Sequence, residues 1–128
     1  MATDLASLAD DVVAAINAFS IPGSHPPAAL GAPLPPEWYE TSLAEMRTAL
    51  VSPYWIEMRD IDPKSKALVI LKVAVVADDG DGSLIGFDPN GQGEFVLALR
   101  DTDPDSARGI DVVSCGVRGD SVGCFLSR

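Results

Sequence analysis

Two cysteines near the end of the sequence flank an Arg-Gly-Asp tripeptide, in the stretch SCGVRGDSVGC (114–124). Glycine in the first position of a two-residue loop is typical of a type II′ turn, so Gly119-Asp120 is predicted to turn a β-hairpin. In that register Cys115 faces Cys124 across neighbouring strands, at a non-hydrogen-bonded position where Cα atoms lie about 4.5 Å apart. The pair is either two small buried thiols or a disulfide.

If Gly119-Asp120 turns a hairpin, the Arg-Gly-Asp tripeptide is present because the turn needs glycine, and no adhesion function is required to explain it. An adhesion motif needs export and an extracellular partner, and the sequence signals neither. A redox-active cysteine needs an exposed thiolate of lowered pKa, and no base or helix start is predicted beside either cysteine.

Two acidic stretches, DDGDGS (78–83) and DTDPDS (101–106), resemble calcium-binding loops at first sight. Both lack the glycine that such a loop needs at its sixth position. Both also lack the glutamate at the twelfth position. That position is Asn90 when the loop is counted from Asp79 and Val112 when it is counted from Asp101. We therefore expect acidic turns and no metal site.

Nothing in the sequence marks a catalytic site. His25 is the only histidine and lies between Ser24 and Pro26 in a proline-rich stretch, whereas a catalytic base must be held rigidly. One histidine and two cysteines leave a zinc ion without a fourth ligand. Carboxylates are numerous, but no pair is marked for acid–base chemistry. We expect a protein that is not an enzyme and uses no cofactor.

The acidic side chains are the informative feature. The formal net charge is −10, and residues 78–105 hold eight acids and one base, Arg100. Such a charge repels nucleic acid and anionic membranes and attracts a basic protein. Alternate turns of an antiparallel meander lie at the same end of a sheet, so two acidic turns should form one rim. The predicted partner-binding residues are Asp78, Asp79, Asp81, Asp101, Asp103 and Asp105, with an apolar surface around Trp38 and Trp55 as the alternative.

The elements that position these residues follow from composition and periodicity. With 128 residues, 47% of them hydrophobic, the chain is predicted to form a single α+β domain. The longest apolar run, 67–77, is too short to span a membrane and contains Lys72, and the N-terminus lacks the basic region of a signal peptide. We expect a cytoplasmic protein.

Helical spacing of apolar residues predicts two N-terminal helices, 4–19 and 36–51. The connector between them, 20–36, is proline-rich and either forms a flexible linker or wraps the domain. An antiparallel sheet of about six short strands should follow. The predicted strands are 54–61, 67–77, 83–88, 93–101 and the two arms of the 110–127 hairpin.

Two stretches resemble the SUKH superfamily. LPPEWYETSLAEM (34–46) is similar to that family's "LP-x-x-Y" helix start, and VAVVADDGDGSLIGFDPNGQGEFVLALRD (73–101) is similar to its acidic, glycine-rich turn followed by two strands. Together they cover about a third of the chain. The resemblance implies an α+β domain that binds other proteins, often as a bacterial immunity protein, and it carries over no catalytic residue.

These observations predict a non-catalytic, acidic, protein-binding domain. An immunity or antitoxin-like protein that neutralises a basic toxin fits the charge best, because complementary charge speeds encounter. The alternative is a homodimeric secretion chaperone or assembly subunit, which would expose an apolar patch. The partner is expected to be a protein, with no nucleic acid and no membrane, and the chain either a monomer or a homodimer.

Overall fold

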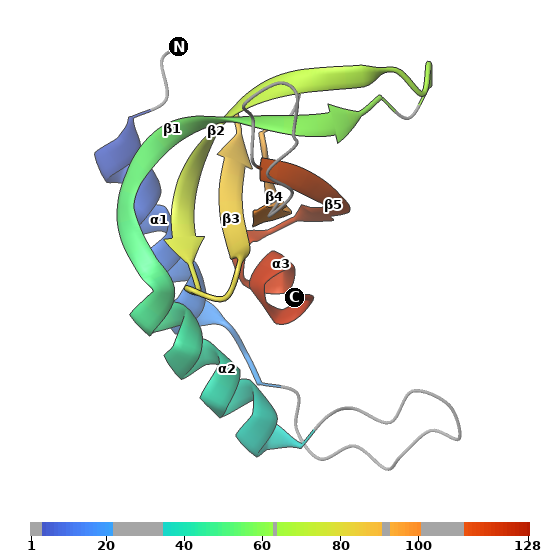
Figure 1. Ribbon diagram of the computed structural model, residues 1–128. Coiled ribbons are helices and arrows are strands. Elements are labelled where there is room, and N and C mark those ends of the chain that lie inside the picture. Colours follow the sequence, from blue (N-terminus) through green and yellow to red (C-terminus); the bar gives the residue numbers. More distant parts are fainter. Residues whose placement is uncertain (1–3, 22–34, 63, 91–92, 101–111) are drawn as a thin grey trace.

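The computed structural model describes residues 4–21, 35–62, 64–90, 93–100 and 112–128, and it confirms the α+β class (Figure 1). The elements are α1 (Leu5–Ala18), α2 (Pro36–Ala49), β1 (Leu50–Ile61), β2 (Leu68–Asp78), β3 (Ser83–Asp88), β4 (Glu94–Arg100), β5 (Val112–Gly119) and α3 (Ser121–Leu126). Two expectations were wrong. Across the described residues the sheet has five strands rather than about six, and a third helix follows the last of them.

The five strands form a closed barrel in sequence order. Each strand pairs antiparallel with the next, as the meander prediction required. Five is an odd number, so the first and last strands of an up-and-down barrel run in the same direction and must pair in parallel. Among the described residues this closing pair is Arg59 with Val113.

Strand β1 starts directly where α2 ends and curves along one side of the barrel (Figure 1). Its pairing with β2 shifts register between Leu50 and Tyr54. Pro53 lies within this irregular stretch, where a residue without an N–H costs the ladder least. The bend lets one twelve-residue strand leave the helix and still reach β5 at the far side.

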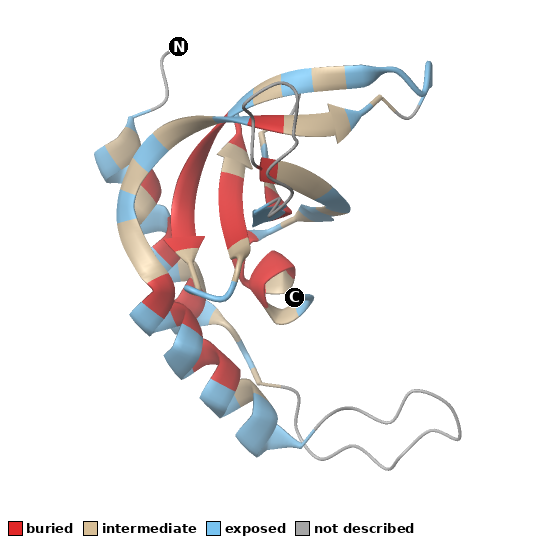
Figure 2. Ribbon diagram, viewed as in Figure 1, coloured by how far each residue is buried: buried red, intermediate tan, exposed pale blue. Residues whose placement is uncertain are grey.

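The barrel has two apolar cores, one on each side of its wall. Alternate residues of β2, such as Val73 and Val75, face the interior, and their neighbours Ala74 and Val76 pack with the helices. All of them are buried, as Figure 2 shows for this strand. Residues 73–77 are therefore apolar on both faces because this half of the strand is covered on both sides, whereas alternate residues of the first half, from Leu68 to Lys72, are exposed.

The predicted 110–127 hairpin was wrong. Residues Ser121–Leu126 form helix α3, and Asp120 is its N-cap, since its carboxylate accepts a hydrogen bond of 2.9 Å from the Gly123 N–H. Val122, Phe125 and Leu126 recur at helical spacing, and Val122 and Phe125 are buried. In the predicted hairpin Phe125 would lie on the same face as Ser121 and Arg118, whereas in the structure it is a core residue of the helix.

The helix also overturns the predicted cross-strand pair Cys115–Cys124. Cys115 lies in β5 and is exposed, whereas Cys124 lies in α3 and is buried, and both are free thiols. Because Cys124 is not in a strand, no hairpin register can place the two side chains opposite each other.

The cap explains the glycine inside such a short helix. A Cβ on Gly123 would lie 2.7 Å from the Asp120 carboxylate. Alanine at a helical position normally stabilises a protein by about 1 kcal/mol relative to glycine, but here it must displace a cap worth about 1 kcal/mol. We expect Gly123→Ala to leave the unfolding free energy nearly unchanged in the wild-type chain and to raise it by about 1 kcal/mol in an Asp120→Ala background. Urea denaturation of the four proteins measures this, and equal effects in both backgrounds would contradict it.

Candidate functional site

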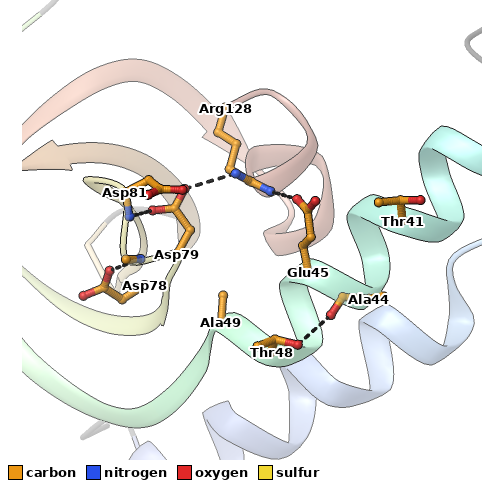
Figure 3. A pocket seen from close by; sticks show the side chains of 10 residues that line it. Thr41, Ala44, Glu45, Thr48, Ala49, Asp78, Asp79, Asp81 and Arg128 are labelled. Atoms are coloured by element: carbon orange, nitrogen blue, oxygen red, sulfur yellow. Dashed lines mark hydrogen bonds and ion pairs between the residues drawn. The ribbon is translucent and has the colours of Figure 1, made fainter.

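A groove runs beside α2, where the β2–β3 turn and the end of α3 approach that helix (Figure 3). It consists of a cavity of about 530 Å³ and an adjoining hollow of about 260 Å³ that share Thr41, Glu45 and Arg128. We call these together the α2 groove. Its charged and aromatic lining residues are Trp38, Glu45, Asp78, Asp79, Asp81, Phe125 and Arg128.

The β2–β3 turn holds its carboxylates in place with backbone hydrogen bonds. Asp78 accepts from the Gly80 N–H at 2.9 Å, and Asp79 accepts from the N–H groups of Asp81 and Ser83 at 2.8 and 3.0 Å. The Gly80 N–H, and then the Arg100 guanidinium at 3.0 Å, hold the pKa of Asp78 below its ordinary value. The carboxylates of Asp78 and Asp79 are therefore fixed in position at the wall of the groove.

Arg128 connects the three elements around the groove. Its guanidinium donates to Asp79 at 3.1 Å and to Glu45 of α2 (Figure 3). It also lies 4.1 Å above the ring of Phe125. Two carboxylates from different elements and one aromatic face thus surround a guanidinium. Sequence reasoning missed Glu45 and Arg128, because nothing in the spacing of residues 45, 79 and 128 indicates that they meet.

The lining of the α2 groove is strongly acidic. The lining holds four carboxylates, those of Glu45, Asp78, Asp79 and Asp81, and one guanidinium, that of Arg128, so the lining side chains carry a net charge of −3. The Asp78 carboxylate also pairs with Arg100, which lies outside the lining. Asp81 is exposed at the tip of the turn. A positively charged group from another molecule is attracted to this lining.

The structure brings together only part of the predicted partner-binding set. Asp78, Asp79 and Asp81 lie at the groove, and Trp38 lines its far end. Trp55 packs half-buried against the core beneath the helices, with the Lys72 ammonium 5.7 Å from its ring.

The other half of the predicted rim, Asp101, Asp103 and Asp105, lies outside the described residues. Strand β4 does end beside the β2–β3 turn, as the meander argument expected. The Arg100 N–H donates to the Gly82 carbonyl at 2.8 Å, and the Arg100 side chain pairs with Asp78.

The Arg-Gly-Asp tripeptide serves internal contacts rather than turning a hairpin. The Arg118 guanidinium donates to Asp60 at 2.8 Å and to the buried Asp88 at 3.1 Å. These side chains line a cavity of about 590 Å³ at one mouth of the barrel. Asp120 caps α3. The predicted type II′ turn was therefore wrong, and both charged groups of the tripeptide already have partners within the chain.

Both thiols are protonated at neutral pH. Burial raises the pKa of Cys124 to about 11, and partial burial also raises that of Cys115. Within the described part of the chain, no three His, Cys, Asp or Glu side chains are grouped so as to hold a metal ion. None of the helices described there is long and apolar enough to cross a membrane.

No family model, no curated protein and no solved structure matches this chain.

Removing Arg118 would leave the buried Asp88 carboxylate without its charge partner. We expect Arg118→Ala to lower the unfolding free energy by about 2 kcal/mol, less than for a fully buried pair because the arginine side chain is 30% exposed. Arg100→Ala is the matched control, since it breaks a more exposed pair with Asp78 and should cost below about 1 kcal/mol. Denaturant unfolding of both variants measures the difference. Equal losses of unfolding free energy would show that the Arg118–Asp88 pair stabilises the protein no more than the exposed Arg100–Asp78 pair.

The two thiols should differ in accessibility. In native protein at mildly alkaline pH, Ellman's reagent should react with Cys115, and Cys124 should react only after unfolding in guanidinium, because it is buried. Cys115→Ser should abolish the native reaction. A native protein that reacts at neither site, and releases two thiols only after reduction, would show a disulfide and contradict the structure.

Proposed function

We propose that this chain is a non-catalytic protein-binding domain that receives a basic segment of its partner in the α2 groove. The observation that carries the proposal is the groove's lining, in which four carboxylates accompany one guanidinium beside an exposed aromatic ring. Three of these carboxylates, those of Glu45, Asp78 and Asp79, are already held by hydrogen bonds and need little reordering on binding, so more of the attraction contributes to affinity.

Arg128 illustrates the chemistry that the groove accepts. Its guanidinium lies between the carboxylates of Asp79 and Glu45 and over the ring of Phe125. Trp38, 37% exposed at the far end, offers a second aromatic face to a lysine or arginine side chain. A partner with two or more basic side chains therefore matches the groove better than a neutral or acidic one.

The biological role that best accounts for these features is an immunity or antitoxin-like protein that neutralises a cognate toxin in the cytoplasm. The sequence resemblance to the SUKH superfamily suggests this class. Toxins that act on nucleic acid are often basic, because they must approach phosphates. A net charge of −10 then speeds capture of the toxin by long-range attraction.

A homodimeric secretion chaperone or assembly subunit is the second candidate. It is favoured by exposed apolar side chains on the barrel's outer face, chiefly Ile61, Leu68, Ile70 and Leu99, which a dimer would cover.

A charge-reversal experiment tests the groove. The partner would be captured from the native host, and association would be measured at two salt concentrations for the wild type, Asp81→Lys and Asp10→Lys. Both substitutions change the net charge equally, but Asp81 lines the groove and Asp10 is exposed on α1. We expect Asp81→Lys to slow association about tenfold at low salt and Asp10→Lys to slow it much less.

An association rate that responds equally to both substitutions would show that only net charge matters. A rate indifferent to salt and to both substitutions would exclude the groove as the binding surface. For the immunity role, cells that produce the captured partner should stop growing unless this chain is co-expressed, and a harmless partner would refute that role.

A further inference from the structure

The helices cover only part of the barrel's outer face. Near the helices, outward-facing side chains such as Trp55, Ala74 and Phe95 pack into the core beneath α1 and α3. Farther along the same face, four aliphatic side chains are exposed beside the charged side chains of Glu57, Arg59 and Lys72. Exposed fractions are 54% for Ile61, 48% for Leu99, 42% for Leu68 and 41% for Ile70.

Strand register joins these side chains into one surface. Leu99 is paired with Val113 and Ile61 with Leu68, while Arg59 is paired with both Val113 and Ile70. Residues directly opposite in a sheet point to the same side, so the row crosses four strands. We call this surface the hairpin face, after the β1–β2 hairpin that carries most of it: Ile61, Leu68, Ile70, Leu99 and Val113.

The hairpin face contains a notch at the seam where β1 meets β5. The notch encloses about 110 Å³ and is lined by Arg59, Asp60, Ile61, Leu68, Val113 and Ser114. That volume admits a single aliphatic side chain. Its aliphatic walls come from β1, β2 and β5, so a residue inserted there would touch three strands.

The same hairpin is the exception to the acidity of the chain. Residues 57–72 hold four bases and three acids, a charge of +1, whereas the other residues hold five bases and sixteen acids, a charge of −11. Lys64, Lys66 and Lys72 are exposed. An exposed aliphatic surface beside lysines is complementary to a segment that carries aliphatic and carboxylate side chains.

We propose that the hairpin face is a docking site for a short peptide segment of another protein that carries both aliphatic and acidic side chains. One aliphatic side chain fills the notch, others cover Ile70 and Leu99, and the carboxylates pair with the lysines. A second copy of the chain fits less well, because each copy carries a charge of −10 and a dimer would bring two lysine-rich hairpins together.

This site is separate from the α2 groove, and the charges around the two sites have opposite signs. The chain would thus bind a basic segment at one surface and an acidic, aliphatic segment at the other.

A library of random peptides displayed on phage, selected against the wild-type chain, provides the probe. We expect enriched peptides to combine aliphatic and acidic residues. The affinity of a synthetic copy should fall about tenfold or more with Ile70→Asp, because a buried aliphatic contact is replaced by a carboxylate. Lys72→Gln should weaken binding about threefold at low salt and less at high salt. Val13→Asp is the matched control, since Val13 is 44% exposed on α1, and it should leave affinity unchanged.

Leu99→Asp, on a different strand, replaces Ile70→Asp as the test if that variant fails to fold. The proposal is overturned if no peptide is enriched, if the enriched peptides lack carboxylates, or if Ile70→Asp and Val13→Asp affect binding equally. A wild-type dimer in sedimentation that Ile70→Asp dissociates would assign the face to a second copy instead. Asp81→Lys should leave peptide affinity unchanged. If the Asp81→Lys variant no longer binds the peptide, the peptide binds in the α2 groove instead.

Discussion

Closure of a five-stranded barrel through one parallel seam is the constraint on which the rest of this structure depends. The seam between β1 and β5 has the single described pair Arg59–Val113, while β1 shares nine residue pairs with β2. Arg118 of β5 reinforces the seam, because its guanidinium binds Asp60 of β1 and Asp88 of β3 at the barrel mouth. The pairing also requires β1 to be long and bent, which the irregular stretch around Pro53 allows.

A closed barrel of this size must bury side chains inside, and its outer face needs a separate cover. The three helices cover one part of that face, and the remainder stays exposed as the hairpin face. Where helix and barrel meet at the β2–β3 turn, the α2 groove forms. The two surfaces proposed for binding are therefore both consequences of partial coverage. They differ in charge because the acids gather in the turn and the lysines in the β1–β2 hairpin.

Local sequence signals predicted most elements of the fold correctly. Residues 54–61 were correctly predicted to form a strand, in which Ile56 and Met58 alternate with Trp55 and Glu57 and face the barrel interior. The acidic stretch 78–83 was correctly placed as a turn, because aspartate and glycine satisfy its backbone locally. Helix α3 was missed because a six-residue segment fits strand alternation and helical spacing almost equally well. Asp120 decides between them only once Gly123 is close enough to donate to it.

The sequence by itself determined the α+β class, the antiparallel meander, the acidic charge and the acidic turn at residues 78–83, since each depends on neighbouring residues or on composition. The tertiary structure alone decided barrel closure, the pairing of Arg118 with Asp60 and Asp88, and the meeting of Arg128 with Glu45 and Asp79. It also separated Cys115 from Cys124. These contacts join residues up to 83 positions apart, and their formation depends on how the strands curve and close, which no local pattern encodes.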